Sequence, residues 1–577
     1  MKPAGLQRAD LGAAALLVLL VALRWHGLPA AFWRADDPAL LLHALQSPGL
    51  AAFVDPADWR RLSPSNLTPW VTLSFKLDLA LAGLRPAVFY GHQLVSAALV
   101  ALAAYALGRQ ALPPAWALAV VLLGLAGAPT AAVTELLMTR HYLEGLLFAL
   151  LSLLAFVQAR RRGAVAWAWA GAALYALACT AKELYVPLVL IVAALPAPHP
   201  PQAAAPRRGP LPLPHPLPHL LPYLLPYLLV ALGYVAWRRV MLGEAVGGYG
   251  AAQPLLSPGS VAAMGRALAH FPADLLGPAW AVVLPLGGVA AALALRGRLA
   301  WLGFSALAAA CLLLPLWPLA AGPGFHGPDR YLYLLWWAVA AGLVAALHGA
   351  VMRLPLQAAA RDAVGLGLAA ALVLAAALQS AAAARPRDEA MRAFEAVGRF
   401  ITAHDARSAY VPPDVVMASY WYVTSLCEIR QRSGASCPQA LIPGWPLDER
   451  IDRLAVYDPA TEAMVDASSR LGEERRRAAD LDRTRPLSAV LALEGGVARW
   501  RFGPHRDGQY FVVSPVLGRY PVAPQGERRV GLAELPFQLQ FDARAGWRTA
   551  SPVLLARPGQ PVAWARAAAE AASAPAR

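Results

Sequence analysis

The stretch LEGLLFALLSLLAFVQARRR, residues 143–162, indicates the fold class of the whole chain. Residues 143–159 are almost entirely apolar, and the cluster Arg160-Arg161-Arg162 follows directly. A run of this kind approaches the length of about 20 residues that an α-helix needs to cross a bilayer. Arginines at its end are typical of the cytoplasmic side of a membrane protein. The stretch therefore predicts a transmembrane helix that ends in the cytoplasm at the arginine cluster.

Apolar runs of similar length recur along the chain up to about residue 384. They lie near 11–28, 88–107, 114–133, 143–159, 164–181, 184–196, 219–237, 276–295, 299–320, 331–350 and 363–384. If the N-terminus with Lys2 and Arg8 is cytoplasmic and the sides alternate, every cytoplasmic connection contains arginine, as the positive-inside rule requires. We therefore expect an all-α multispanning membrane protein of about 11 transmembrane helices, with the first span retained and not cleaved as a signal peptide.

Composition supports a membrane location and excludes nucleic acid as a partner. The chain has 577 residues, 58% of them hydrophobic, and a formal net charge of +15. Its arginines gather at the ends of the apolar runs and form no continuous basic stripe. The expected partner of this charge is membrane lipid. With an odd number of spans and a cytoplasmic N-terminus, the C-terminal part is extracytoplasmic, and the expected location is the bacterial inner membrane.

Two domains are predicted from the change in charge density, residues 1–384 in the membrane and residues 385–577 outside it. The first domain contains a first outer loop, 32–87, and a Pro-rich cytoplasmic linker, 196–218. Apolar groups at helical spacing over 388–404 predict an amphipathic helix. The mixed charge run 473–477 indicates a solvated helix face.

Alternating segments later in the tail predict strands, so the expected soluble domain is α+β. They are 489–493, 498–502 and 509–513. Cys427 and Cys437 lie ten residues apart and, in an oxidising compartment, could form a disulfide. Cys179 and Cys311 fall in predicted spans and are expected to be buried small hydrophobic side chains.

The predicted topology brings ionisable residues from distant parts of the chain to the outer face. They are Asp36, Asp37, Arg140, Lys182, Glu183, Arg238 and Arg330, with Tyr331 beside the last. Ionisable groups near the hydrocarbon region are costly and tend to mark functional sites. A lipid phosphate needs Arg or Lys donors, and an acceptor hydroxyl needs a carboxylate base. Asp36 or Asp37 suits the base, and the cations suit the phosphate.

Each of these residues also has a structural interpretation. Asp37 before Pro38 fits an N-cap with proline at the first helical position. Lys182 and Glu183 could form a local ion pair at a helix start. The outer arginines could bind lipid head groups, and Glu135 and Glu144 are expected to be solvated or helix-capping.

Five motifs together resemble the GT-C superfamily, the integral-membrane glycosyltransferases that use polyprenyl-phosphate-linked sugars and include the protein O-mannosyltransferases. The motifs are Asp36-Asp37 after the first span, PWVTLSF at 69–75, FYGHQ at 89–93, Lys182-Glu183 ahead of Val186-Pro187, and Arg-Tyr-Leu-Tyr at 330–333. The resemblance covers roughly residues 1–350. Unlike some eukaryotic members, the chain shows no 34-residue repeat after residue 385.

The resemblance implies a glycosyltransferase reaction that inverts the sugar, with Asp36 or Asp37 as base and polyprenyl monophosphate as leaving group. Arg140, Lys182, Glu183, Arg238, Arg330 and Tyr331 are then expected to bind the lipid phosphate or the sugar. Some relatives hold a divalent metal with such acids, but a monophosphate donor does not require one, so no obligatory metal or other cofactor is predicted. The acceptor, a glycan, a lipid or a protein of the cell envelope, stays open.

Two other functions share the same topology. A transporter or flippase for a lipid-linked saccharide would need ionisable groups in mid-span or paired broken helices. A non-catalytic assembly component of an envelope polysaccharide system would bind the same lipid-linked sugar without transferring it. The predicted polar groups lie on one side of the membrane, which favours the transferase.

Overall fold

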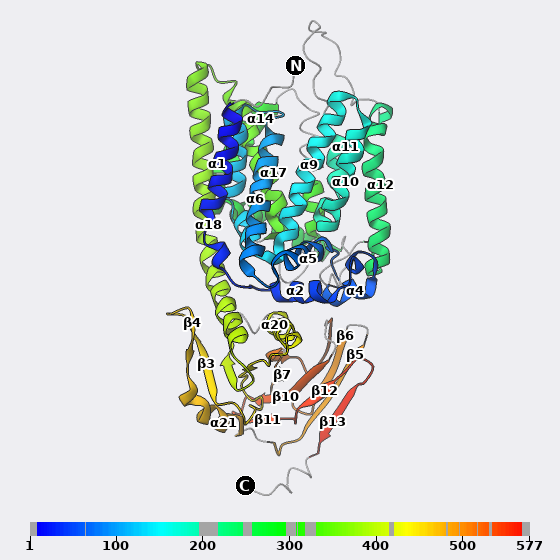
Figure 1. Cartoon of the computed structure of the whole chain (residues 1–577), viewed down its shortest axis with the longest axis vertical. Coiled ribbons are helices and arrows are strands. Elements are labelled where there is room, and N and C mark those ends of the chain that lie inside the picture. The colour runs from blue at the N-terminus through cyan, green and yellow to red at the C-terminus, as the bar shows by residue number, and fades with distance from the viewer. Residues whose placement is uncertain are drawn as a thin grey trace. The chain divides into compact units, whose positions relative to one another are not determined.

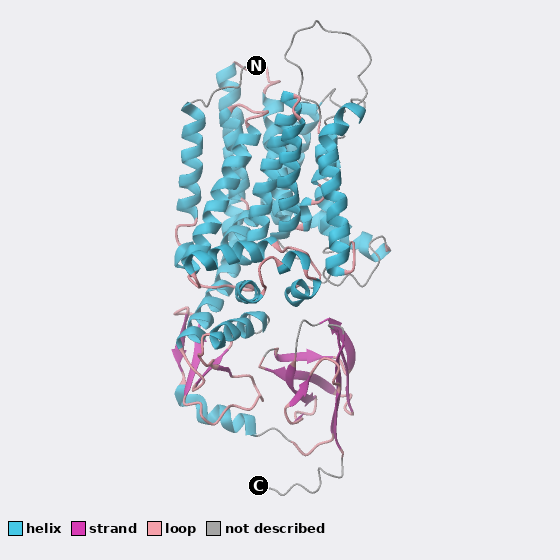
Figure 2. Cartoon of the chain, turned by 45° about the vertical axis from the view of Figure 1, so that its right-hand side comes forward, coloured by secondary structure: helices cyan, strands magenta, loops and turns pink. Residues whose placement is uncertain are grey.

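The computed structural model describes residues 8–63, 65–195, 217–245, 257–295, 307–308, 310–317, 330–414, 420–479, 483–494, 497–515, 517–529 and 534–567. The chain forms two compact units. The helical unit comprises Met1–Ala31 and Ser47–Arg387, and the mixed unit comprises Phe32–Gln46 and Asp388–Arg577. All strands of the described residues belong to the mixed unit (Figures 1 and 2).

The helical unit is a bundle of α-helices (Figure 1), with short 3-10 turns at some of the connections. Its elements are α1 (Arg8–Arg24), η1 (Leu28–Ala30), α3 (Ala51–Val54), α4 (Pro56–Leu62), α5 (Trp70–Ala82), α6 (Pro86–Gly108), α7 (Pro114–Ala126), α8 (Ala128–Glu135), η2 (Leu137–Thr139), α9 (Arg140–Arg162), α10 (Val165–Ala181), η3 (Glu183–Tyr185), α11 (Leu188–Ala194), α12 (Leu217–Leu242), α13 (Pro258–Leu276), η4 (Gly277–Ala279), α14 (Trp280–Leu295), η5 (Leu314–Leu316), η6 (Arg330–Leu332) and α17 (Tyr333–Val351). The long α18 (Ala358–Ala403) begins here and continues into the mixed unit.

Seven helices of the described residues are long and apolar enough to cross a membrane, or eight if the bent pair Pro114–Ala126 and Ala128–Glu135 is one span. The chain is therefore a multi-pass membrane protein by helix length and composition. The predicted runs 164–181 and 184–196 form helices shorter than a full span, α10 and η3–α11. Most of the run 299–320 lies outside the described residues, as does 196–216 of the predicted linker. The count of 11 spans stays a prediction.

Local sequence sets the ends of the helices that carry the polar residues. Gly163 adopts a left-handed conformation, φ 65°, directly after α9, and its N–H bonds back to the carbonyl of Ala159. This cap ends α9 at the arginine cluster, and α10 packs back along it. Gly171 of α10 leaves room for the Tyr227 hydroxyl, since a Cβ there would lie 2.1 Å from it. α9, α10 and α12 thereby pack as one group.

Continuous helices cross or fill two of the predicted boundaries. The predicted boundary at residue 384 lies three residues before the division between the two compact units at Arg387, and both positions fall inside α18, which is continuous for 46 residues and contains Pro386. The predicted amphipathic helix 388–404 is therefore the last part of this same helix. The predicted first outer loop 32–87 contains α2 (Asp37–Gln46), α3, α4 and α5. Its first part, Phe32–Gln46, belongs to the mixed unit because it packs on helices from the far end of the chain.

One part of the mixed unit is a four-stranded sheet in the order β2-β1-β3-β4 with helices against it. The strands are β1 (Ser408–Val411), β2 (Gln439–Ala440), β3 (Arg453–Asp458) and β4 (Ala463–Asp466), and the helical elements are α2, the end of α18, α20 (Tyr420–Arg432), η7 (Ser468–Arg470) and α21 (Leu471–Ala479). β1 is parallel to β2 and β3, and β4 is antiparallel. The predicted solvated helix over 473–477 is confirmed by α21.

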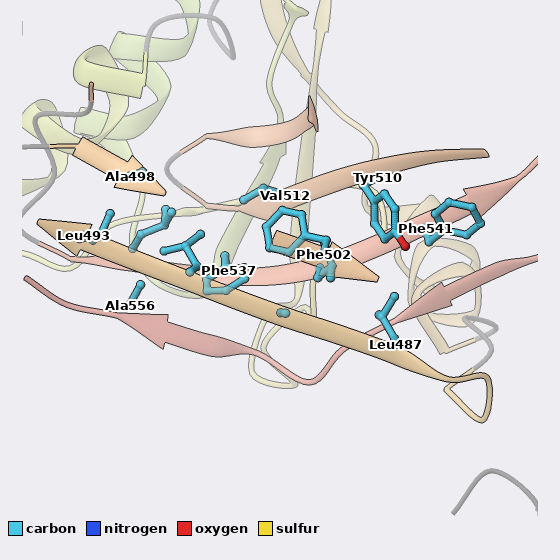
Figure 3. Close-up of a cluster of buried hydrophobic side chains, with 13 residues drawn as sticks. Leu487, Leu493, Ala498, Phe502, Tyr510, Val512, Phe537, Phe541 and Ala556 are labelled. Carbon is cyan, nitrogen blue, oxygen red and sulfur yellow. The ribbon is translucent and has the colours of Figure 1, made fainter. Parts of the chain in front are cut away.

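The other part of the mixed unit consists of two antiparallel sheets that share one apolar core (Figure 3). Their strands are β5 (Leu487–Glu494), β6 (Val497–Gly503), β7 (Gly508–Ser514), β8 (Gly518–Val522), β9 (Gln525–Arg529), β10 (Leu535–Ala543), β11 (Arg548–Ala550), β12 (Leu554–Ala556) and β13 (Val562–Arg566). The strands predicted at 489–493, 498–502 and 509–513 are confirmed. Leu491, Phe502 and Phe537 meet between the sheets because alternate side chains of each strand point inward.

The mixed unit also contains the disulfide expected between Cys427 and Cys437. Their Cα atoms are 5.7 Å apart. The bond ties α20 to the segment that leads into β2. Cys179 and Cys311 are free and buried, as predicted.

Candidate functional site

Three cations from separate segments gather at one end of the helical unit. Lys182 follows α10, Arg238 lies in the last turns of α12, and Arg330 opens η6 before α17. Burial, together with the positive charges of Arg330 and Arg238, lowers the pKa of Lys182 to about 7. The neighbouring Glu183 also accepts a hydrogen bond from the backbone N–H of Leu67 at 2.8 Å, just before α5. The cluster therefore lies at the end of the bundle where α4 and α5 lie (Figure 1).

Lys182 is a buried ammonium without a carboxylate partner among the described residues. Its residue is 4% exposed, and its Nζ lies 5.1 Å from the centre of the Tyr142 ring. A cation over an aromatic face is attracted by the ring, but this recovers only part of the cost of leaving water. An anion bound beside Lys182 would supply the missing charge.

Glu183 pairs with Arg238 and not with Lys182. The Arg238 guanidinium also donates to the carbonyl of Ser65 at 3.3 Å. The expected local ion pair between Lys182 and Glu183 is therefore wrong. Lys182 has extended backbone angles, φ −156° and ψ 139°, so consecutive side chains point to opposite sides.

Arg330 and Tyr331 border the same cluster. The Arg330 guanidinium lies 4.9 Å from the centre of the Tyr331 ring and donates to its hydroxyl at 3.3 Å. The Tyr331 ring in turn meets Tyr142 edge-on, with centroids 6.4 Å apart. This region therefore contains two tyrosines and three cations, which come from four separate segments of the chain. Aromatic and cationic side chains together suit a ligand that carries both a sugar ring and a phosphate.

Arg140 belongs to a second, separate cluster. Its side chain is fully buried and pairs with Asp78 of α5 at 2.5 Å, and it donates to the carbonyl of Phe89 at 2.6 Å. The sequence grouped Arg140 with Lys182 because both reach one membrane face. In the structure, the Arg140 guanidinium is buried and pairs with Asp78.

The same second cluster contains Glu144 and His92. Glu144 accepts from Trp70 Nε1 at 2.7 Å and from Ser74 Oγ at 3.0 Å, and it is buried. His92 turns Nδ1 to Asp78 at 2.8 Å and Nε2 to Glu144 at 3.2 Å. Both ring nitrogens can donate only in the protonated imidazole. Two cations then balance two carboxylates, and this network needs no ligand to be neutral.

The expectation of a solvated side chain is therefore wrong for Glu144, whereas Glu135 is partly exposed. Glu135 accepts from Trp25 Nε1 at 3.3 Å and pairs with Arg387. Neither partner was visible in the sequence, since Trp25 and Arg387 are more than a hundred residues away on either side. Asp78, His92 and Glu144 were not predicted as a group. One feature of the sequence could have grouped them, which is that all three lie near helix ends. His92 is in the second turn of α6, Glu144 is in the second turn of α9, and Asp78 is near the end of α5.

Asp36 and Asp37 lie in the mixed unit, at the tight turn that leads into α2. The Asp37 carboxylate accepts from the backbone N–H of Arg34 at 2.8 Å, and the Asp37 N–H donates to the Arg34 carbonyl at 2.9 Å. Asp37 is fully buried and Asp36 is half-buried. Helix α2 begins at Asp37, and the Asp36 carbonyl accepts from Ala39 and Leu40, so the cap position is Asp36, one residue earlier than predicted. Asp37 therefore closes the turn, and Asp36 is the more accessible carboxylate.

No group of three or more His, Cys, Asp or Glu side chains that could hold a metal ion occurs among the residues described. The expected independence from a metal stays a prediction. Comparison with protein-family models, with curated proteins and with solved structures gave no match.

Proposed function

We propose that this chain is a membrane glycosyltransferase that takes a sugar from a polyprenyl-phosphate donor at the outer face of the bacterial inner membrane. The observation that supports this most is the buried Lys182, which lies beside Arg238 and Arg330 and has no carboxylate partner in the described part of the chain. A lipid phosphate is an anion delivered at the depth of the helix ends. The resemblance to the GT-C superfamily supplies the reaction class.

In the proposed reaction, the acceptor oxygen forms a bond to the anomeric carbon as the bond from that carbon to the phosphate oxygen breaks. The acceptor proton passes to the Asp36 carboxylate, and polyprenyl monophosphate leaves with the bonding electron pair. Lys182, Arg238 and Arg330 stabilise the charge that grows on the phosphate. Because the acceptor oxygen attacks from the side opposite the leaving group, the configuration at the anomeric carbon is inverted. Asp37 acts as the turn-closing residue beside the base.

Transport is less well supported by the positions of the charges. His92 lies in the second turn of α6, and Arg140 and Glu144 lie in the first two turns of α9. These groups are near helix ends and are balanced by each other. A transporter pathway would place ionisable groups along the middle of the spans.

The test uses full-length protein in proteoliposomes, radiolabelled polyprenyl-phosphate hexoses as donors and envelope fractions as acceptors. The expected result is release of polyprenyl monophosphate with label in acceptor material, abolished in Asp36→Asn and reduced at least about tenfold in Lys182→Met. Lys76→Met is the matched control, since Lys76 bonds only the carbonyls of Ser47 and Gly49 among the contacts observed. Full activity in Asp36→Asn, Asp37→Asn and the double variant would overturn the base assignment. Movement of intact donor across the bilayer without cleavage would favour the flippase.

A further inference from the structure

The segment that carries the acid pair packs on the C-terminal part of the chain. Phe32–Gln46 forms one compact unit with Asp388–Arg577, and α2 packs against α20. Contacts to residues beyond 390 are made before the acid pair by Phe32, Trp33 and Arg34, and after it by Gln46 at the end of α2. This grouping is independent of the cationic cluster, which lies in the helical unit.

Tyr422 of α20 is the most buried of these partners. Its side chain is 0% exposed, and its hydroxyl lies 3.0 Å from the carbonyl oxygen of Trp33 and 2.7 Å from that of Phe394. The Tyr422 hydroxyl therefore lies between the backbone of the segment 32–46 and the backbone of α18. Gly398 makes this approach possible, because a Cβ there would lie 2.0 Å from the Tyr422 hydroxyl and 2.9 Å from the Phe32 ring.

Arg34 supplies the second attachment. Its guanidinium bonds the Glu395 carboxylate through Nε at 2.7 Å and Nη2 at 2.6 Å, and both side chains are about 15% exposed. Arg34 is also the residue whose backbone N–H and carbonyl close the turn with Asp37. The Glu395 ion pair therefore acts on the same residue that sets the conformation of the acid pair.

The turn needs such support because its backbone is strained. Ala35 has φ +44°, a left-handed conformation that costs a residue with a side chain about 1 kcal/mol. Ala35 directly precedes Asp36. A strained conformation persists only where surrounding contacts hold it.

We propose that Tyr422 and Glu395 are positioning residues for the proposed base, so that the part of the mixed unit beyond Asp388 is required for transfer. This inference rests on the proposed function. The two residues hold the backbone at Trp33 and Arg34, and this fixes the direction of the Asp36 carboxylate. A displacement of about 1 Å in a catalytic group can reduce the rate by about a hundredfold.

The test compares Tyr422→Phe with Tyr410→Phe in the full-length protein. Tyr410 is equally buried in the same unit, and its hydroxyl has no hydrogen-bond partner among the residues that the structure describes, so its loss should change nothing. Tyr422→Phe should lower kcat at least about tenfold and leave the KM for the polyprenyl-phosphate hexose within about twofold. Hydrogen exchange of the amides at 34–37 should become faster in Tyr422→Phe and not in Tyr410→Phe.

Exchanging the two charges tests the ion pair between Arg34 and Glu395. Glu395→Arg alone should lower kcat, and Arg34→Glu combined with Glu395→Arg should restore at least part of it. Gly398→Ala should act in the same direction as Tyr422→Phe, because its Cβ displaces the tyrosine hydroxyl.

The outcomes separate the two proposals. Faster exchange at 34–37 with unchanged kcat in Tyr422→Phe would overturn the positioning role while leaving the transferase intact. Unchanged exchange would overturn the anchoring itself. If the wild-type protein cleaves none of the polyprenyl-phosphate hexoses, the transferase proposal fails, and with it the positioning role, whereas the anchoring is still decided by the exchange measurement.

Discussion

Glu183 forms an ion pair with Arg238, 55 residues further along the chain, and not with its neighbour Lys182. The two residues of the predicted Lys182-Glu183 motif therefore have different roles. Glu183 joins α12 to the segment before α5, and Lys182 is left as a buried cation beside an aromatic ring. The proposed phosphate site depends on that division.

Donor binding should weaken as pH rises above about 7. The pKa of Lys182 lies at about 7 in the folded protein, below its ordinary value of 10.5, so above pH 7 the free site loses the charge that the phosphodiester requires. The KM should rise by up to about tenfold per pH unit. Steady-state kinetics from pH 6 to 9 measure this. Lys182→Arg should flatten the profile, and Lys76→Arg should not. A profile that is unchanged in Lys182→Arg would contradict the assignment.

The same pKa shift makes a prediction about stability. The folded protein binds fewer protons at Lys182 than the unfolded chain between pH 7 and 10.5, so this group adds stability as pH rises through that range. Below pH 7 the cost of the buried charge is fully present. Lys182→Met should therefore unfold at a temperature no lower than the wild type at pH 6. Thermal unfolding in detergent measures this, and a clear loss of stability would mean that Lys182 has a structural anionic partner.

Asp78→Asn should destabilise the helical unit by about 3–5 kcal/mol, because it leaves the fully buried Arg140 without its carboxylate. The comparison variant is Glu494→Gln on β5, which removes an exposed ion-pair partner of Arg499 and should cost about 0–1 kcal/mol. Unfolding in graded denaturant measures both. Equal effects of the two substitutions would show that Arg140 finds another anion.

Glu183→Gln should weaken both stability and donor binding. The substitution removes the charge opposite Arg238, and breaking a largely buried pair costs about 3 kcal/mol. The double variant Glu183→Gln with Arg238→Gln should be more stable than the sum of the single losses predicts, which a double-mutant cycle measures. Strict additivity would mean that the two side chains do not interact in the folded protein.

Cys427 and Cys437 should resist alkylation in the native and in the denatured, non-reduced protein. Cys179 and Cys311 are free and buried, so they should react only after denaturation. Mass spectrometry of alkylated peptides measures all four. Closing a loop of ten residues stabilises by about 3 kcal/mol, so Cys427→Ser with Cys437→Ser should lower the stability of the mixed unit. Reaction at Cys427 before reduction would contradict the bond.

Much of the secondary structure followed from local patterns. The apolar run that ends at Arg160 became α9, and the alternating segments at 489–493 and 509–513 became β5 and β7. These patterns suffice because the period of a helix or strand is written in neighbouring residues. The change in charge density predicted a boundary at residue 384, close to the division at Arg387, but it did not predict that α18 runs through this position without a break.

The sequence by itself determined that the chain is a multi-pass membrane protein with a separate α+β part, and it selected Lys182, Arg238 and Arg330 as related residues. Only the tertiary structure decided which charges neutralise each other. Arg140 pairs with Asp78, Glu183 with Arg238, and Arg34 with Glu395, 361 positions away. Hydropathy is a property of consecutive residues, whereas the partner of a buried charge is whatever group the packed helices bring within about 3 Å of it. For that reason the sequence indicated the acid pair, and only the fold showed that residues beyond 390 contact the segment that carries it.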